Sequence, residues 1–189
     1  MKKLRYMVGT IVALTALVAT GAAIAHGVVV IKGTMKADTL TGTPGKDRII
    51  ARAGDDLVNA GDGNDHVYGN RDNDTLNGDA GNDRVWGGYG NDAVNGGDGN
   101  DILRGRPGDD NLDGGPGNDR IWPGRGADTQ NGGDGDDVLH SLARDRQVDT
   151  IDCGPGNDVL WLNVKETTDV YVNCETVKTV SVLRDGDDS

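Results

Sequence analysis

Aspartates recur along this chain at an interval of nine residues. Twelve consecutive members of the series keep that spacing: Asp38, Asp47, Asp56, Asp65, Asp74, Asp83, Asp92, Asp101, Asp110, Asp119, Asp128 and Asp137. An apolar residue stands two positions after each of them, with Gln130 as the one exception, and a glycine precedes most of them by two positions. Carboxylates are ligands for hard cations, and glycine lets backbone carbonyls approach a ligand closely. The spacing therefore predicts a row of oxygen-rich cation sites.

The aspartate series continues after an interruption. The nine-residue phase fails within residues 141–148 and resumes at Asp149 and Asp158. The residue three positions after each aspartate is mostly small and polar in odd repeats and mostly bulky in even repeats, and Asp152 and Trp161 fit those two columns. A three-residue insertion therefore interrupts a series of fourteen repeats.

Short strands joined by glycine-rich turns must hold these aspartates in place. In the triplet after each aspartate, the central apolar residue would point inward and its neighbours outward, because side chains alternate along a strand. One apolar residue in nine makes a core too thin to offset the ordering entropy of the chain. A column of carboxylates stacked about 4.8 Å apart would repel itself unless a cation lay between its members. The metal is therefore expected to be part of the core.

The repeats GGYGND (87–92), GGDGND (96–101) and GGPGND (114–119) resemble the RTX (repeats-in-toxin, haemolysin-type) family of calcium-binding nonapeptides. The resemblance covers residues 33–140. It implies an all-β fold, a parallel β-roll (β-solenoid) in which two repeats form one 18-residue coil, with several Ca²⁺ ions held between stacked loops by aspartate carboxylates and loop carbonyls. We therefore expect about seven coils over residues 33–161, with the fourteen aspartates as calcium ligands.

The N-terminus is typical of an export signal. A basic start precedes an uncharged, largely apolar run over residues 7–20, and Ala23-Ile24-Ala25 matches the small-x-small cleavage pattern. We expect a signal peptide over residues 1–25, a secreted mature chain with no membrane span, and a lead-in over residues 26–32. An uncleaved anchor is the alternative, because residues 28–31 add apolar length.

The C-terminal region departs from the repeat. Residues 162–183 are rich in valine and predict a small β cap that covers the last coil, followed by an acidic tail over residues 184–189. Cys153 and Cys174 in an exported chain are expected to form a disulfide that ties the cap to that coil, with two free thiols as the alternative. The same pairing also looks like a C-terminal arrangement of some exported bacterial RTX proteins.

Composition argues against several classes of function. The net charge of −12 disfavours nucleic acid and anionic membranes as partners and favours cations. Only 35% of the residues are hydrophobic and 4% aromatic, which is little for the core of an ordinary enzyme. The three histidines have no zinc-ligand spacing and the serines no nucleophile-elbow context, so we expect no enzyme and keep one only as the least favoured alternative.

One outer face of the roll is predicted to differ from the other. Even repeats place bulky and basic residues in two adjacent outward columns, among them Tyr68, Arg84, Trp86, Arg104, Arg120, Trp122 and Trp161. Cross-strand packing that stabilises the coils is one interpretation. The other is a binding face for a cell-surface glycan or for a second copy of the chain. A calcium-dependent adhesion or glycan-binding module is therefore the alternative to a secreted calcium-binding protein.

Overall fold

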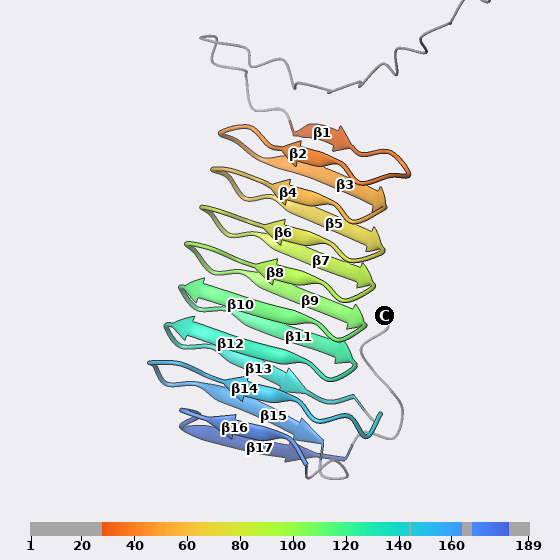
Figure 1. Ribbon diagram of the computed structural model, residues 1–189. Helices are drawn as coiled ribbons and strands as arrows, with labels where there is room; N and C mark the ends of the chain where they lie inside the picture. Colours follow the sequence, from red (N-terminus) through yellow and green to blue (C-terminus); the bar gives the residue numbers. More distant parts are fainter. Residues whose placement is uncertain (1–27, 144, 164–167, 182–189) are drawn as a thin grey trace, which may run out of the picture.

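The computed structural model describes residues 28–143, 145–163 and 168–181, and the predicted signal peptide and acidic tail lie outside these ranges. Their strands form two parallel sheets that face each other along a solenoid (Figure 1). Sheet A contains β1 (Val29–Lys32), β3 (Asp47–Ala53), β5 (His66–Arg71), β7 (Arg84–Tyr89), β9 (Ile102–Pro107), β11 (Arg120–Arg125), β13 (Val138–Ser141), β15 (Val159–Asn163) and β17 (Thr176–Val180). Sheet B contains β2 (Thr39–Thr41), β4 (Leu57–Asn59), β6 (Thr75–Asn77), β8 (Ala93–Asn95), β10 (Asn111–Pro116), β12 (Thr129–Asp134), β14 (Thr150–Asp152) and β16 (Val170–Val172).

Each coil gives one strand to each sheet, and successive coils stack in parallel register. Val58 pairs with Leu76, which lies one 18-residue coil further along the chain. Across the interruption the register changes by three residues, because Thr129 pairs with Thr150. This confirms the all-β parallel β-solenoid and the three-residue insertion. No helix in the described part of the chain is long and apolar enough to cross a membrane.

The solenoid extends further at both ends than the repeat motif indicates. Strand β1, within the expected lead-in, pairs with β3 in sheet A. Strands β16 and β17, within the expected cap, pair in parallel with β14 and β15. The β cap is therefore one more coil built from a degenerate sequence, and the solenoid has about eight turns rather than seven.

The core is a narrow double row of apolar side chains between the sheets. From β2 to β15, each strand buries the residue two positions after its repeat aspartate, as Leu76 is buried in β6 and Val85 in β7, and exposes or half-buries the neighbours, whereas β16 and β17 of the last coil expose Tyr171 and Val177. Since each coil adds only a few such side chains, the apolar core is as thin as the sequence predicts.

Gln130 is the polar exception in this core. Its side chain is 1% exposed, stands in register between Leu112 and Ile151, and neither amide atom has a hydrogen-bond partner. Because a buried amide without partners loses its hydration, Gln130→Leu is expected to raise the free energy of unfolding by about 1–3 kcal/mol. Denaturation at saturating calcium measures this, with the exposed neighbour substitution Thr129→Val as the control. An equal or lower stability of the Gln130 variant would contradict the prediction.

The predicted disulfide is confirmed. Cys153, in the loop after β14, is bonded to Cys174, between β16 and β17, over a sequence separation of 21. The bond therefore fastens the last coil to the one before it.

Loss of this disulfide should release the last coil first. In the chain-entropy account, a cross-link over a loop of this length stabilises the fold by about 3 kcal/mol. We expect the double variant Cys153→Ala with Cys174→Ala to lose about that much free energy of unfolding. Relative to the unmodified chain, amide hydrogen exchange should quicken more in β16 and β17 than in β6. Exchange that quickens equally in all three strands would show that the bond does not act locally.

Candidate cation-binding loops

The fourteen aspartates stand where a glycine-rich loop enters a strand. Those of odd repeats precede sheet B strands and those of even repeats precede or begin sheet A strands. All of them except Asp38 are buried. The fold thus gathers the predicted ligands into two columns, one along each long edge of the solenoid.

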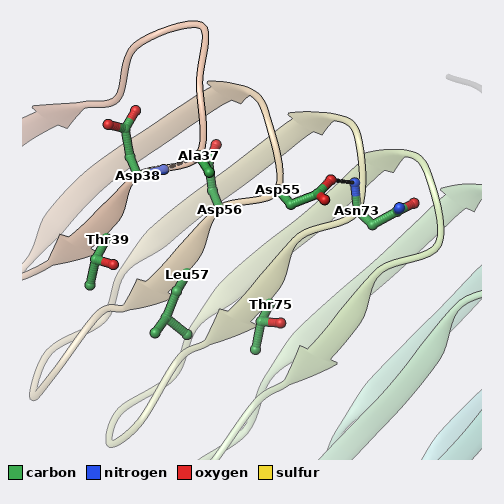
Figure 2. Close-up of a pocket in the computed structure, with 8 residues that line it drawn as sticks. All are labelled: Ala37, Asp38, Thr39, Asp55, Asp56, Leu57, Asn73 and Thr75. Atoms are coloured by element: carbon green, nitrogen blue, oxygen red, sulfur yellow. Dashed lines mark hydrogen bonds between the residues drawn. The ribbon is translucent and has the colours of Figure 1, made fainter.

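The first oxygen of these carboxylates holds neighbouring coils together. The backbone N–H of Asp83 donates to Oδ1 of Asp101 at 2.7 Å, and the N–H of Asp101 donates to Oδ1 of Asp119 at 2.7 Å. Figure 2 shows the start of the other column, where the N–H of Asp38 donates to Oδ1 of Asp56 at 2.7 Å. We call these two rows of bonds the aspartate ladders.

The second oxygen has no donor in most repeats. Oδ2 is buried without a hydrogen-bond partner in Asp56, Asp65, Asp74, Asp83, Asp92, Asp101, Asp110, Asp119, Asp128, Asp137 and Asp158. Its surroundings are other oxygens: a Cβ atom added to Gly96 would lie 2.5 Å from Oδ2 of Asp101 and 2.6 Å from the carbonyl oxygen of Gly114. A buried carboxylate oxygen beside a carbonyl and without a donor is costly unless a cation satisfies both.

This donor set fits calcium. Ca²⁺ takes carboxylate and backbone carbonyl oxygens in flexible geometry. Nowhere in the described ranges do three His, Cys, Asp or Glu side chains gather at one point. A cation bound in these loops would meet carboxylate and carbonyl oxygens, as calcium prefers, rather than the nitrogen and sulfur ligands that zinc prefers.

Burial raises the pKa of the aspartate carboxyls. The pKa rises to about 8 for Asp110 and Asp128, chiefly because the carboxylates are desolvated, and partly because neighbouring aspartates repel them. The hydrogen bond that each carboxylate accepts from a backbone N–H in the ladder lowers the pKa, but by less than burial raises it. The pKa is raised to about 7 in Asp74, Asp83 and Asp119, and to about 6 in Asp65, Asp92, Asp101, Asp137 and Asp149. Without a bound cation, burial therefore favours the protonated form of these carboxyls.

Sequence reasoning missed a second ladder, formed by the residue just before each aspartate. The N–H of Asn100 donates to Oδ1 of Asn82 at 2.8 Å, and the N–H of Asn82 to Oδ1 of Asn64 at 2.9 Å. Figure 2 looks onto a hollow of about 330 Å³ where the N–H of Asn73 bonds Oδ1 of Asp55 at 3.0 Å. This asparagine ladder runs opposite to the aspartate ladders. The signal was the Asn or Asp that precedes the repeat aspartate in most repeats.

The C-terminal ends of the aspartate ladders use two acids outside the predicted set. The N–H of Asp149 donates to Oδ1 of Asp169 at 3.2 Å, and the N–H of Asp158 donates to Oε2 of Glu175 at 2.9 Å. Donation from that N–H lowers the pKa of the exposed Glu175 carboxyl. The spacings of 20 and 17 residues fall outside the repeat, which is why periodicity did not find them.

Threonine caps the N-terminal ends of the ladders. The N–H and the hydroxyl of Thr34 donate to Oδ2 of Asp38 at 2.6 and 2.9 Å, and Thr43 does the same for Asp47 at 2.5 and 3.1 Å. The first two aspartates therefore differ from most of the later ones, because donors already occupy the oxygen that is orphaned there; Asp149, whose Oδ2 accepts from the Ser141 hydroxyl at 2.8 Å, resembles the first two.

The bulky column on the outer face of sheet A is stacked in two stretches, from Tyr68 to Trp86 and from Arg104 to Trp161. Tyr68 lies on Trp86 with ring centroids 4.7 Å apart and an interplanar angle of 1°, and Trp122 lies on His140 at 4.5 Å and 11°. The guanidinium of Arg104 covers the other side of Trp122 at 5.1 Å. Each of these rings thus has at least one face covered by a neighbouring ring, as in cross-strand packing.

The remaining members of the predicted face lie around this stack. Trp161 follows His140 with centroids 6.4 Å apart and carries Lys178 over its ring at 4.8 Å. Arg84 and Arg120 are exposed in the adjacent outward column. The fold therefore brings all of the predicted face residues to one side of the solenoid.

The family comparison agrees with this geometry. The family described as RTX calcium-binding nonapeptide repeat (4 copies) matches residues 33–67, 68–103 and 95–130, which together cover just over half of the chain. No curated protein matches it. The matched residues include nine of the aspartates that carry orphan oxygens, Asp56 to Asp128, and the chain belongs to the RTX calcium-binding nonapeptide repeat family.

Proposed function

We propose that this chain is a secreted protein whose β-roll folds on binding several extracellular Ca²⁺ ions through its fourteen repeat aspartates. The observation that carries the proposal is the unbroken run of buried carboxylates from Asp56 to Asp137, each with one oxygen that has no donor. Calcium bound there would neutralise the carboxylates and coordinate the orphan oxygens.

Folding and calcium binding are coupled in this proposal. Neither the thin apolar core nor the hydrogen bonds of the ladders can offset the free-energy cost of burying so many carboxylates. Calcium binds loops that exist only in the folded chain, so its binding free energy adds to the stability of the fold. Low cytosolic calcium would keep the precursor unfolded for export, and calcium outside the cell would fold it. RTX repeats are typical of secreted proteins, and the N-terminal signal pattern supports this route.

A calcium titration of the chain from residue 26 tests the coupling. At neutral pH we expect a disordered circular dichroism spectrum in chelator and a β spectrum in millimolar calcium, with magnesium much less effective because it demands small octahedral sites. A full β spectrum in chelator at neutral pH would overturn the proposal. The mass of the protein recovered from culture medium tests separately whether residues 1–25 are removed.

A matched pair of substitutions tests the ligands. Asp101→Asn removes a buried carboxylate with an orphan oxygen, whereas Asp98→Asn removes an exposed one from the same loop. We expect fewer calcium ions bound and a higher folding midpoint for the Asp101 variant only. Equal midpoints for the two variants would show that overall charge, not coordination, sets the calcium requirement.

The second candidate function is a calcium-dependent adhesion module that uses the outer face of sheet A. The observation that favours it is the concentration of arginine on that face beside the aromatic stack. RTX repeats are typically non-catalytic, and we propose no enzymatic activity for this chain.

A further inference from the structure

Within the strands of the solenoid, positive charge is confined to sheet A. The strands of sheet A contain eight arginines, and those of sheet B contain neither arginine nor lysine. Six of the eight are exposed: Arg48, Arg52, Arg71, Arg84, Arg120 and Arg125. We call the outer surface of sheet A the arginine face.

Negative charge gathers elsewhere on the surface. The loops that follow sheet B strands expose Asp62, Asp79 and Asp98, and the end of β12 exposes Asp134. Asp47, the one acid in a sheet A strand, is buried. On a chain with a net charge of −12, this segregation leaves a single basic surface. An anion is therefore expected to favour the strands of sheet A over those of sheet B.

The exposed arginines follow the solenoid axis. Arg48, Arg84 and Arg120 occupy one row of the register, with His66 and Ile102 between them. Coils stack at the interstrand distance, so these arginines recur about every 10 Å along a straight line. A line of regularly spaced cations suits a linear polymer with repeated anionic groups.

The side chains of the arginine face indicate which class of polymer it can bind. Between the terminal strands β1 and β17, the one exposed large apolar residue in sheet A is Tyr89. A protein partner is usually held by several aromatic or aliphatic side chains that become buried in the interface. Single-stranded nucleic acid is usually held by aromatic rings whose faces are open for bases to stack on. The rings of this face are stacked on one another, so the groups that remain are guanidinium forks, which bind carboxylate or sulfate through paired N–H donors.

We propose that the arginine face binds a linear acidic polysaccharide, bearing carboxylate or sulfate groups, laid along the solenoid axis. This inference rests on the proposed calcium-folded roll, because only stacked coils bring Arg48, Arg84 and Arg120 into line. It gives the second candidate function a ligand class, and it assigns recognition to charge rather than to sugar rings stacked on tryptophan.

Binding of the calcium-loaded chain to immobilised dextran sulfate, polygalacturonate, neutral dextran and duplex DNA tests the proposal. We expect binding to one or both acidic polysaccharides that weakens with salt, and none to neutral dextran. The triple variant Arg48→Gln, Arg84→Gln and Arg120→Gln should lose about tenfold or more in affinity. The matched control Thr75→Glu, Asn111→Glu and Thr150→Glu changes the net charge equally on sheet B at the same coil spacing, and should bind as the unmodified chain does.

Circular dichroism and calcium titration of the same samples separate failure of the face from failure of the fold. If the chain is β-rich with calcium but binds neither acidic polysaccharide, this inference is wrong and the calcium proposal stands. Equal losses in the two triple variants would also overturn it. Tighter binding to DNA, or self-association abolished by the arginine substitutions, would assign the face to nucleic acid or to a second copy instead.

Discussion

Without calcium, the chain is expected to be unfolded at neutral pH and to fold when the solution is acidified to about pH 5 or below. Burial raises the pKa of Asp110 and Asp128 to about 8 in the fold, whereas an aspartate in the unfolded chain has a pKa of about 3.9. Between these values the folded state binds more protons than the unfolded state, so stability falls as pH rises. The stability of the calcium-free fold should thus be greatest near pH 4, fall steadily toward about pH 8, and level off above it.

Circular dichroism in chelator, titrated across that range, measures the acid-induced folding. The calcium concentration at the folding midpoint should also be lower at about pH 6 than at neutral pH, because partial protonation already stabilises the calcium-free fold there, even though protons compete with calcium for the carboxylates. The variant Asp110→Asn keeps the Oδ1 acceptor of the ladder and removes an ionisable group. It should fold in chelator at higher pH than the unmodified chain, while the exposed substitution Asp62→Asn should leave the curve in place. A calcium-free chain that loses β structure on acidification would refute the buried-carboxylate account.

Gly114→Ala is expected to destabilise the calcium-loaded roll by about 3–4 kcal/mol. An added Cβ would collide with Oδ2 of Asp119 and with the carbonyl oxygen of Gly132 in the next coil. Neither atom can retreat easily, because the aspartate ladder fixes Asp119 and the coil stacking fixes Gly132. The same methyl group would fill the space between two candidate ligand oxygens, so the calcium midpoint should rise as well.

Gly45 provides the control for this substitution. It also lies in a repeat loop, but an added Cβ would meet no atom within 4 Å. Gly45→Ala should therefore change the free energy of unfolding by less than about 0.5 kcal/mol. Chemical denaturation of both variants at saturating calcium measures the difference. Similar losses would mean that loop flexibility, not contact with the neighbouring coil, makes these glycines necessary.

Most of the fold could be predicted from the periodicity of the sequence. A spacing of nine fixes which side chains point inward, and the alternation of Asp152 and Trp161 between columns placed the insertion correctly. Asp169 and Glu175 escaped notice because the last coil keeps the backbone register with a different number of residues. The asparagine ladder escaped because its bonds depend on how far apart coils stack and which way a side chain turns. The stacking of Tyr68 on Trp86 likewise follows from register and rotamer, which spacing alone does not determine.

The aspartate and asparagine ladders, which run in opposite directions, also limit how the length of this chain can change by duplication or deletion. In the middle of the solenoid each coil gives and receives the same bonds as its neighbours, so duplication or deletion of 18 residues joins equivalent ends and leaves both faces intact. Gain or loss of nine residues would instead move every later strand to the opposite sheet. Downstream arginines would then emerge on the face that now carries Thr75 and Asn111, and the charge pattern would be scrambled. Drift in the length of this chain should therefore proceed in steps of two repeats.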